Sequence, residues 1–302
     1  MIIIVGCPSG YQNNANHTPV RILWAKWVPS DHLQELAKGF TKETGIPVII
    51  DQVPWEDFQE YFYAHMASKD TKYDLVGGDS QWIGKCVQEG HYIDLSYLYE
   101  VNNIEEKMID AAIKGYCEYP ANSDRFWAVP LQGDAMGIAY RKDLFEDADE
   151  KEAFKEEYGK ELEIPRTWEE LLDIARFFNR PNQGMYGIAV WSDEKYDGIT
   201  MGANTLLWAY GGSIGDKETM QVKDKLSAKG SVAGLKMYKK LYNEGSPEWS
   251  NAYLDTTEFF VQGKAAMIFS YFAFFPGLLD SEYNPYSDFT GFFSCPEGPA
   301  GR

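Results

Sequence analysis

Hydrophobic periodicity near the start of the chain predicts a strand, a helix and a second strand. Residues 20–24 form a short apolar run, and residues 33–40 place apolar side chains at helical spacing. Gly45 and Pro47 are typical of a helix end, and residues 46–50 then form a continuous apolar run that suits a buried parallel strand. Because the three elements follow one another within about thirty residues, the pattern predicts a β-α-β unit.

A third predicted strand, residues 73–76, leads into the sequence Gly-Gly-Asp-Ser-Gln-Trp. Two glycines let the backbone approach a ligand closely. Asp79, Gln81 and Trp82 would then stand at the carboxyl end of a strand, where ligands collect in open α/β sheets. The alternative for Asp79 is the N-cap of a helix over residues 80–88, which does not exclude a ligand contact.

The segment 256–272 combines a short helix, a glycine stop and a buried strand. Thr256 or Thr257 can cap the helix, Gly263 can take the left-handed conformation that ends it, and the apolar run after it has the length of a strand. The strand would deliver Ser270 and Tyr271 to its carboxyl end as a ligand surface. Phe272, which follows them, fits core packing equally well.

Aromatic side chains end two further predicted elements. Residues 186–191 are typical of a strand that ends in Trp191. Residues 201–210 predict an apolar helix on which Trp208 lies one turn after Asn204.

Chain length and charge limit the classes of function. A chain of 302 residues exceeds one typical core and predicts two lobes of roughly 100 to 200 residues each. The net charge of −18 comes with no basic stripe, which argues against nucleic acid and against binding to anionic membrane surfaces. Such an acidic chain stays soluble readily, and we expect a monomer. The aromatic fraction of 15% is more than a core requires, so we expect some aromatic rings to line a cleft.

The N-terminus has features of a bacterial lipoprotein signal. An apolar run over residues 1–5 closes on Gly6 and then Cys7, the residue that would accept the lipid. The basic region and most of the apolar region of a signal are missing, so a misplaced start or an accidental match is the alternative. Residues 8–19 would then be a flexible tether between lipid and body. After the N-terminus no run of about 18 apolar residues predicts a membrane helix.

The remaining motifs argue against an enzyme with a cofactor. Cys86, Cys117 and Cys295 have no metal-binding spacing; Cys86 could pair with Cys117, although two buried thiols fit better. There is no dinucleotide-binding motif in register, no P-loop, no serine-hydrolase elbow and no zinc-protease motif. The 4 histidines all lie in the first third, which argues against a triad or metal site drawn from both lobes. We therefore expect no cofactor and no metal.

The sequence Gly-Lys-Ala-Ala-Met at residues 263–267 resembles a signature of family 1 extracellular solute-binding proteins, the sugar-capturing components of bacterial ABC importers. Leu-Trp-Ala-Tyr-Gly-Gly at residues 207–212 and the Pro/Gly-rich residues 295–302 are similar to further family features. The resemblance covers nearly all of residues 20–302. Family members continue beyond this point with further helices, so the resemblance implies a chain truncated at its C-terminus.

The resemblance implies a type II periplasmic-binding-protein-like α/β fold with two lobes, each a mostly parallel sheet flanked by helices. Residues 1–19 would be the signal remnant and tether, residues 20–131 with 262–302 lobe one, and residues 132–261 lobe two. It also implies that a carbohydrate, by preference an oligosaccharide, is captured between the lobes by hinge closure outside the cell. The protein would deliver it unchanged to a membrane permease powered by a separate ATPase, so the resemblance implies no catalysis.

Aromatic rings suit sugars because the C–H groups of a sugar ring stack on them while its hydroxyls bond to polar side chains. The candidates for stacking are Trp24, Trp55, Trp82, Trp191, Trp208 and Tyr271, and those for polar contact are Asp79, Gln81, Asp134 and Ser270. Asp134 comes from the resemblance, which maps a family acid near the crossing between the lobes onto it. Two alternatives remain: the same fold binding a polyamine or another cation, and a secreted carbohydrate-active enzyme, since a glycosidase needs only two carboxylates.

Overall fold

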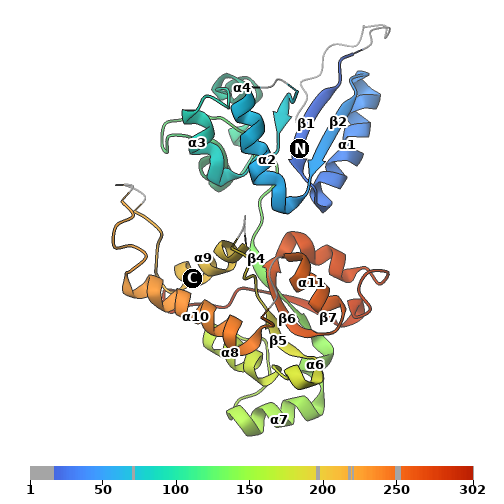
Figure 1. Cartoon of the computed structure of the whole chain (residues 1–302), viewed down its shortest axis with the longest axis vertical. Coiled ribbons are helices and arrows are strands. Elements are labelled where there is room, and N and C mark those ends of the chain that lie inside the picture. The colour runs from blue at the N-terminus through green and yellow to red at the C-terminus, as the bar shows by residue number, and fades with distance from the viewer. Residues whose placement is uncertain are drawn as a thin grey trace. The chain divides into compact units, whose positions relative to one another are not determined.

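The computed structural model of the chain describes residues 17–69, 72–194, 198–216, 219, 221–248 and 253–301. The chain divides into two compact units, with the boundary between Gly133 and Asp134. Each unit combines one sheet with helices (Figure 1), and the predicted two-lobed α/β fold is confirmed. Within the described ranges, no helix has both the length and the apolar character needed to cross a membrane.

The first unit is built on a three-stranded parallel sheet with the order β2-β1-β3. Its strands are β1 (Val20–Ala25), β2 (Val48–Val53) and β3 (Leu75–Val76). Its helices are α1 (Val28–Thr44), α2 (Trp55–Ser68), α3 (Ile83–Gln88), α4 (Ser96–Asn102) and α5 (Asp110–Ala112). The order β1, α1, β2 confirms the predicted β-α-β unit. Gly45 ends α1 in the left-handed conformation, with φ 75°.

The second unit holds a four-stranded sheet with the order β5-β6-β4-β7. Its strands are β4 (Met136–Arg141), β5 (Tyr186–Ala189), β6 (Ala265–Tyr271) and β7 (Thr290–Ser294). Its helices are α6 (Lys142–Glu146), α7 (Ala148–Tyr158), α8 (Trp168–Phe177), α9 (Gly198–Ala209), α10 (Lys229–Gly245) and α11 (Tyr253–Val261).

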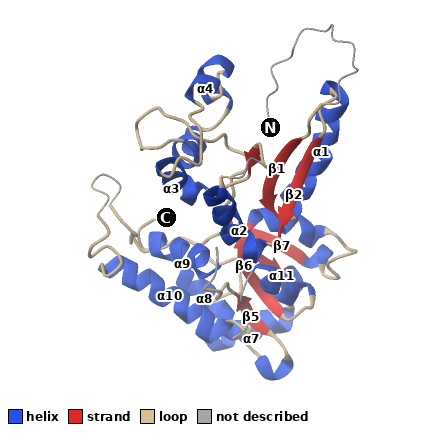
Figure 2. Cartoon of the chain, turned by 45° about the horizontal axis from the view of Figure 1, so that its top comes forward, coloured by secondary structure: helices blue, strands red, loops and turns tan. Residues whose placement is uncertain are grey.

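Both faces of this sheet are covered by separate apolar clusters. On one face, buried side chains of α8, α9 and α10 pack on Ile138, Ile188 and Phe269. On the other face, α11 and the 3-10 helix Phe272–Leu279 pack on Ala139 and Ile268. Figure 2 shows the strands of this unit between α11 and the group of α8, α9 and α10. The sheet is therefore buried on both faces, and only its ends are available to a ligand.

Two sequence expectations about the second unit were wrong. Residues 262–302, expected in the first lobe, lie in the second unit, because β6 pairs with β4 and β5, and β7 pairs with β4. The sheet is not mostly parallel, because β4 runs antiparallel to both β6 and β7, and only β5 and β6 are parallel. As a result, the start of β4 lies beside the end of β6.

The predicted helix, stop and strand of residues 256–272 are present, with one change. The helix α11 begins at Tyr253, so the threonines expected as caps, Thr256 and Thr257, are buried inside it. Gly263 ends the turn after α11 with φ 71°, and β6 follows directly.

Candidate ligand-binding sites

Three tryptophans meet at the carboxyl end of the sheet in the first unit; we call Trp24, Trp27 and Trp55 the indole corner. Trp24 is the penultimate residue of β1, Trp27 follows that strand, and Trp55 begins α2 just after β2. The ring of Trp27 lies 5.6 Å from that of Trp24 and 5.1 Å from that of Trp55, both in edge contacts. Trp24 is buried, with 8% of its surface exposed, whereas Trp27 and Trp55 are half-buried.

The backbone of Trp27 is fixed by the start of α1, of which it is the N-cap residue. Ser30 Oγ accepts from the Trp27 N–H at 3.2 Å and donates to the Trp27 carbonyl at 2.8 Å. The Gln52 side chain of β2 donates in turn to Ser30 Oγ at 2.8 Å and to Asp31 Oδ1 at 2.7 Å. These bonds tie the N-terminus of the helix to the neighbouring strand and fix the backbone that carries the Trp27 ring.

The two glycines after β3 serve the protein's own side chains. Gly77 lies opposite Trp24, and a Cβ there would come within 2.5 Å of the indole ring. A Cβ on Gly78 would collide with the Tyr92 hydroxyl. From the sequence, we expected these glycines to let a ligand approach the backbone. In the structure they make room for the side chains of Trp24 and Tyr92.

The polar candidates after β3 remain accessible, but Trp82 does not. Gln81 is exposed and donates from Nε2 to Asp79 Oδ2 at 3.0 Å, and Asp79 is half-buried. Asp79 occupies the N-cap position of the 3-10 turn Ser80–Trp82, yet its side chain makes no capping bond. Trp82 is 2% exposed and packs on Phe58 and Phe62, with ring centroids 5.7 Å and 4.6 Å away. The ring of Trp82 therefore belongs to the core of the unit.

In the second unit, three chain segments bring Asp134, Trp191, Tyr271 and Phe274 to one end of the sheet, which we call the acid-aromatic edge. Met136 in β4 is the register partner of Tyr271 in β6, and the Phe272 N–H donates to the Ala135 carbonyl at 3.0 Å. Because β5 runs parallel to β6, Trp191 follows the end of β5 beside them. The antiparallel entry of β4 is what brings Asp134 to this edge.

The Asp134 carboxylate is preorganised by two backbone donors. Its Oδ1 accepts from the Ala135 N–H at 2.8 Å and from the Ala273 N–H at 3.2 Å. Among the described residues no donor reaches Oδ2, so this oxygen can accept from a ligand. The residue keeps access to solvent, yet desolvation by the surrounding protein raises the pKa of its carboxyl above the ordinary 3.8, although both N–H donors oppose this.

Tyr271 is the open ring of the acid-aromatic edge. It is half-buried, with its centroid 5.6 Å from that of Trp191 and 6.3 Å from that of Phe274. Trp191 beneath it is 2% exposed, and its carbonyl accepts from the buried Tyr238 hydroxyl at 2.5 Å. Trp191 thus supports Tyr271 and offers no open face of its own in this structure.

Two other predicted ligand residues, Ser270 and Trp208, belong to neither constellation. Ser270 is fully buried in β6 opposite Gly137, and its hydroxyl has no hydrogen-bond partner among the described residues. A ligand therefore has no access to Ser270 in this structure. Trp208 is 48% exposed near the end of α9, and the structure gives it no contact with the acid-aromatic edge. Cys7, the predicted lipid acceptor, lies outside the described residues.

The family model for bacterial extracellular solute-binding proteins matches residues 26–301, nearly the whole chain. The chain belongs to this family. No protein in the curated set matches the sequence of this solute-binding protein.

Solved structures agree with the fold of this solute-binding protein. A solute-binding protein of an ABC transporter from Agrobacterium radiobacter, in complex with ribitol, has a TM-score of 0.76 and 24% identity over 94% of this chain and 68% of its own. One from Agrobacterium vitis, with bound D-mannitol, has a TM-score of 0.71 and 17% identity over 94% of this chain and 65% of its own. Maltose-bound MalE3 of T. maritima has a TM-score of 0.74 and 24% identity over 94% of this chain and 69% of its own. The chain thus spans about two thirds of the length of these proteins.

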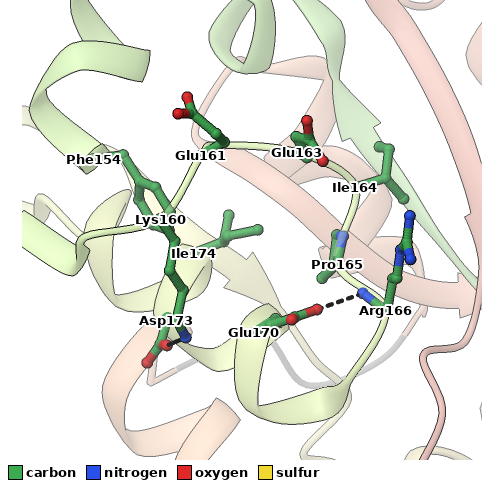
Figure 3. Close-up of a pocket in the computed structure, with 10 residues that line it drawn as sticks. All are labelled: Phe154, Lys160, Glu161, Glu163, Ile164, Pro165, Arg166, Glu170, Asp173 and Ile174. Atoms are coloured by element: carbon green, nitrogen blue, oxygen red, sulfur yellow. Dashed lines mark hydrogen bonds and ion pairs between the residues drawn. The ribbon is translucent and has the colours of Figure 1, made fainter.

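A hollow on the second unit of this solute-binding protein lies at a different place from the acid-aromatic edge. It has a volume of about 170 Å³ and is formed by α7, α8 and the loop between them (Figure 3). Lys160, Asp173 and Glu170 use their charged groups within the protein: Lys160 pairs with Asp173 at 3.0 Å, and Glu170 accepts from the Arg166 N–H at 2.8 Å. None of the predicted ligand residues lines it.

The described part of this solute-binding protein has no group of three or more side chains that could hold a metal ion. Cys86 and Cys117 are buried free thiols, as expected, and burial raises the pKa of the Cys117 thiol to about 11. Burial also raises the pKa of the Cys86 thiol, so the reactive thiolate form is disfavoured at both positions.

Sequence reasoning missed Trp27 and Phe274 as members of the two constellations. A usable signal existed for Trp27: it follows the carboxyl end of a predicted strand, the same position that selected Asp79. For Phe274 there was none, because the bend of the chain after β6 depends on the bond from Ala273 to Asp134.

Proposed function

We propose that this solute-binding protein captures a carbohydrate outside the cytoplasm and delivers it to the membrane permease of an ABC importer. Membership of the extracellular solute-binding family places the protein outside the cytoplasm. The cargo is inferred from the acid-aromatic edge, where a half-open aromatic ring stands beside a carboxylate oxygen that no described donor occupies. A sugar offers the complementary pair, an apolar C–H face and a hydroxyl donor.

The indole corner supports the same cargo independently. It presents two half-buried indole rings at the carboxyl end of a parallel sheet, the edge where such sheets bind ligands. The structurally similar proteins named above, with ribitol, mannitol and maltose, agree with a polyhydroxylated cargo.

Calorimetric titration of the full chain with ribitol, D-mannitol, tagatose, maltose and maltotriose tests the carbohydrate directly. Binding of at least one of them, with the ligand recovered unchanged by mass spectrometry, is the expected result. At 100 times the dissociation constant the ligand should also stabilise the fold by about 2.7 kcal/mol. Recovery of a cleaved product would contradict pure binding and favour a carbohydrate-active enzyme.

A cationic cargo such as a polyamine is the second candidate, because the accessible Asp79 and Asp134 carboxylates belong to a chain of net charge −18. Asp79→Asn separates the two. The exchange removes charge and keeps shape, so it should weaken spermidine binding far more than sugar binding. The cargo would be a polyamine, and not a carbohydrate, if the wild type binds spermidine, Asp79→Asn does not, and none of the sugars binds.

We further propose that Cys7 carries a lipid that anchors this protein to the membrane, with residues 8–19 as the tether. A labelled fatty acid supplied to expressing bacteria should label the wild-type protein and Cys117→Ala, but not Cys7→Ser. Label on Cys7→Ser would disprove the anchor.

The protein is proposed to act as a monomer, which light scattering after gel filtration checks.

A further inference from the structure

Trp27 is the central member of the indole corner and has an unusually constrained backbone. Its ring contacts those of both Trp24 and Trp55, while its own N–H and carbonyl are bonded to Ser30. The side chain is half-buried, and its Nε1 atom is among the buried atoms. What remains accessible of this indole is therefore its carbon surface.

The indole corner also holds an acceptor, on Gln52 of β2. Gln52 donates both of its side-chain hydrogen bonds from Nε2, to Ser30 and to Asp31. These two bonds fix the orientation of the amide and leave Oε1 as its remaining polar atom. No donor among the described residues reaches Oε1. Gln52 and the Trp27 backbone meet on the same Ser30 hydroxyl, so the free acceptor belongs to the same corner.

An apolar ring surface with an acceptor in the same corner favours a particular shape of ligand. A closed sugar ring presents a flat C–H face with its hydroxyls at the rim, and it is already rigid before it binds. An open-chain polyol must be ordered on binding, which costs conformational entropy, and it turns hydroxyls toward the indole, where they lose water without gaining a partner.

We propose that Trp27, with Gln52 beside it, is the stacking platform of the first unit and makes the protein select ring-form sugars over the corresponding open-chain alditols. This inference rests on the proposed carbohydrate cargo. It adds a residue that determines specificity and narrows the class of cargo.

The test compares matched pairs on the full chain by calorimetry: ribose with ribitol, mannose with mannitol, glucose with glucitol and galactose with galactitol. For the pairs that bind, we expect the ring form to bind about tenfold more tightly, equivalent to about 1.4 kcal/mol. Trp27→Leu should remove most of this preference, with a loss of about tenfold for the ring form and less than about twofold for the alditol. Trp27→Phe keeps an aromatic face and should retain most of the preference.

Tyr97→Leu is the matched control, because Tyr97 is an exposed aromatic residue of the same unit, on α4, with 76% of its surface accessible. It should leave both affinities unchanged. Equal or tighter binding of the alditols by the wild-type protein would overturn the inference and leave the carbohydrate function intact. This comparison needs no variant, so misfolding of Trp27→Leu does not affect it.

Two further results would also overturn the inference. One is an unchanged ring preference in folded Trp27→Leu, judged by near-UV circular dichroism. The other is an equal loss in Tyr97→Leu, which would show that the effect is not specific to the indole corner. If no sugar and no alditol binds to the folded wild-type protein, the proposed function fails, and this inference fails with it.

Discussion

At the scale of single residues, we propose two separable roles for Asp134. Its Oδ1 holds the Ala273 N–H and with it the chain after β6, while Oδ2 is left for a ligand. Asp134→Asn keeps an oxygen for the two backbone donors and removes the charged acceptor. We expect its thermal stability to stay close to wild type and its sugar affinity to fall about five- to tenfold, since a bond to a charged group is worth about 1 kcal/mol more than a neutral one.

Asp134→Ala should lose both roles. Its sugar affinity should fall further than that of Asp134→Asn, and its melting temperature should fall as well, because the Ala135 and Ala273 N–H groups lose the acceptor that fixes the chain after β6. Calorimetry and thermal unfolding measure the two effects side by side. Sugar affinity at the wild-type level in folded Asp134→Ala would remove Asp134 from the site.

The pH dependence of binding provides a second residue-scale prediction. Desolvation raises the pKa of Asp134 above 3.8, and only the ionised carboxylate accepts at both oxygens. Binding should therefore be strongest above the raised pKa and weaken as the pH falls through it, beginning at a higher pH than an ordinary aspartate would cause. Affinity titrated from neutral to acid pH checks this. Asp134→Asn should remove this dependence. If the variant shows the same pH dependence as the wild type, another group causes it.

At the scale of elements, Gly263 controls the passage from α11 into β6. Its φ is 71°, its N–H donates to the Phe260 carbonyl at 2.9 Å, and a Cβ would meet the Tyr286 hydroxyl. Gly263→Ala should therefore destabilise the protein by about 1–3 kcal/mol. Gly39→Ala is the matched control: it lies in the exposed middle of α1, where a Cβ has open space, and it should stabilise by about 0.5–1 kcal/mol. Urea denaturation should give opposite signs, and equal effects would refute the conformational argument.

The elements that sequence could predict are those fixed by local patterns. The strands near residues 20, 48 and 75 and the glycine stops at Gly45 and Gly263 follow from apolar periodicity and from backbone conformation. The placement of β6 could not be predicted in this way. Its partner β4 is more than a hundred residues earlier, and a hydrophobic run does not state which strand it pairs with or in which direction.

The same limit explains which of the predicted ligand residues are accessible in the structure and which are buried. Sequence position selected strand ends correctly, and Asp79, Tyr271 and Trp55 do lie at such ends with open surface. Burial of Trp82 and Trp191 depends on tertiary neighbours such as Phe62 and Tyr271, which the local pattern does not contain. Asp134 and Tyr271 lie at the same end of the sheet because β4 runs antiparallel to β6, and the direction of pairing cannot be read from the local sequence.

At the scale of the whole molecule, the net charge of −18 provides a test of the cargo that needs no knowledge of the site. A field of that size attracts cations over distances of about the Debye length, which shrinks from about 10 Å at 0.1 M salt to about 3 Å at 1 M. A neutral sugar does not respond to this field. Its affinity should therefore change less than about twofold between about 0.05 M and 0.5 M sodium chloride.

A polyamine cargo would behave in the opposite way. Its affinity should fall steadily with salt, and Asp79→Asn should flatten that fall by removing one of the charges it meets. Calorimetric titration of the full chain at several salt concentrations separates the two cases, with sodium sulfate at equal ionic strength as the control for ion-specific effects. Flat affinity in both salts supports the carbohydrate. If the affinity of the bound ligand instead falls steeply with either salt, and falls less in Asp79→Asn, the acidic surface takes part in recognition and the cargo is a cation.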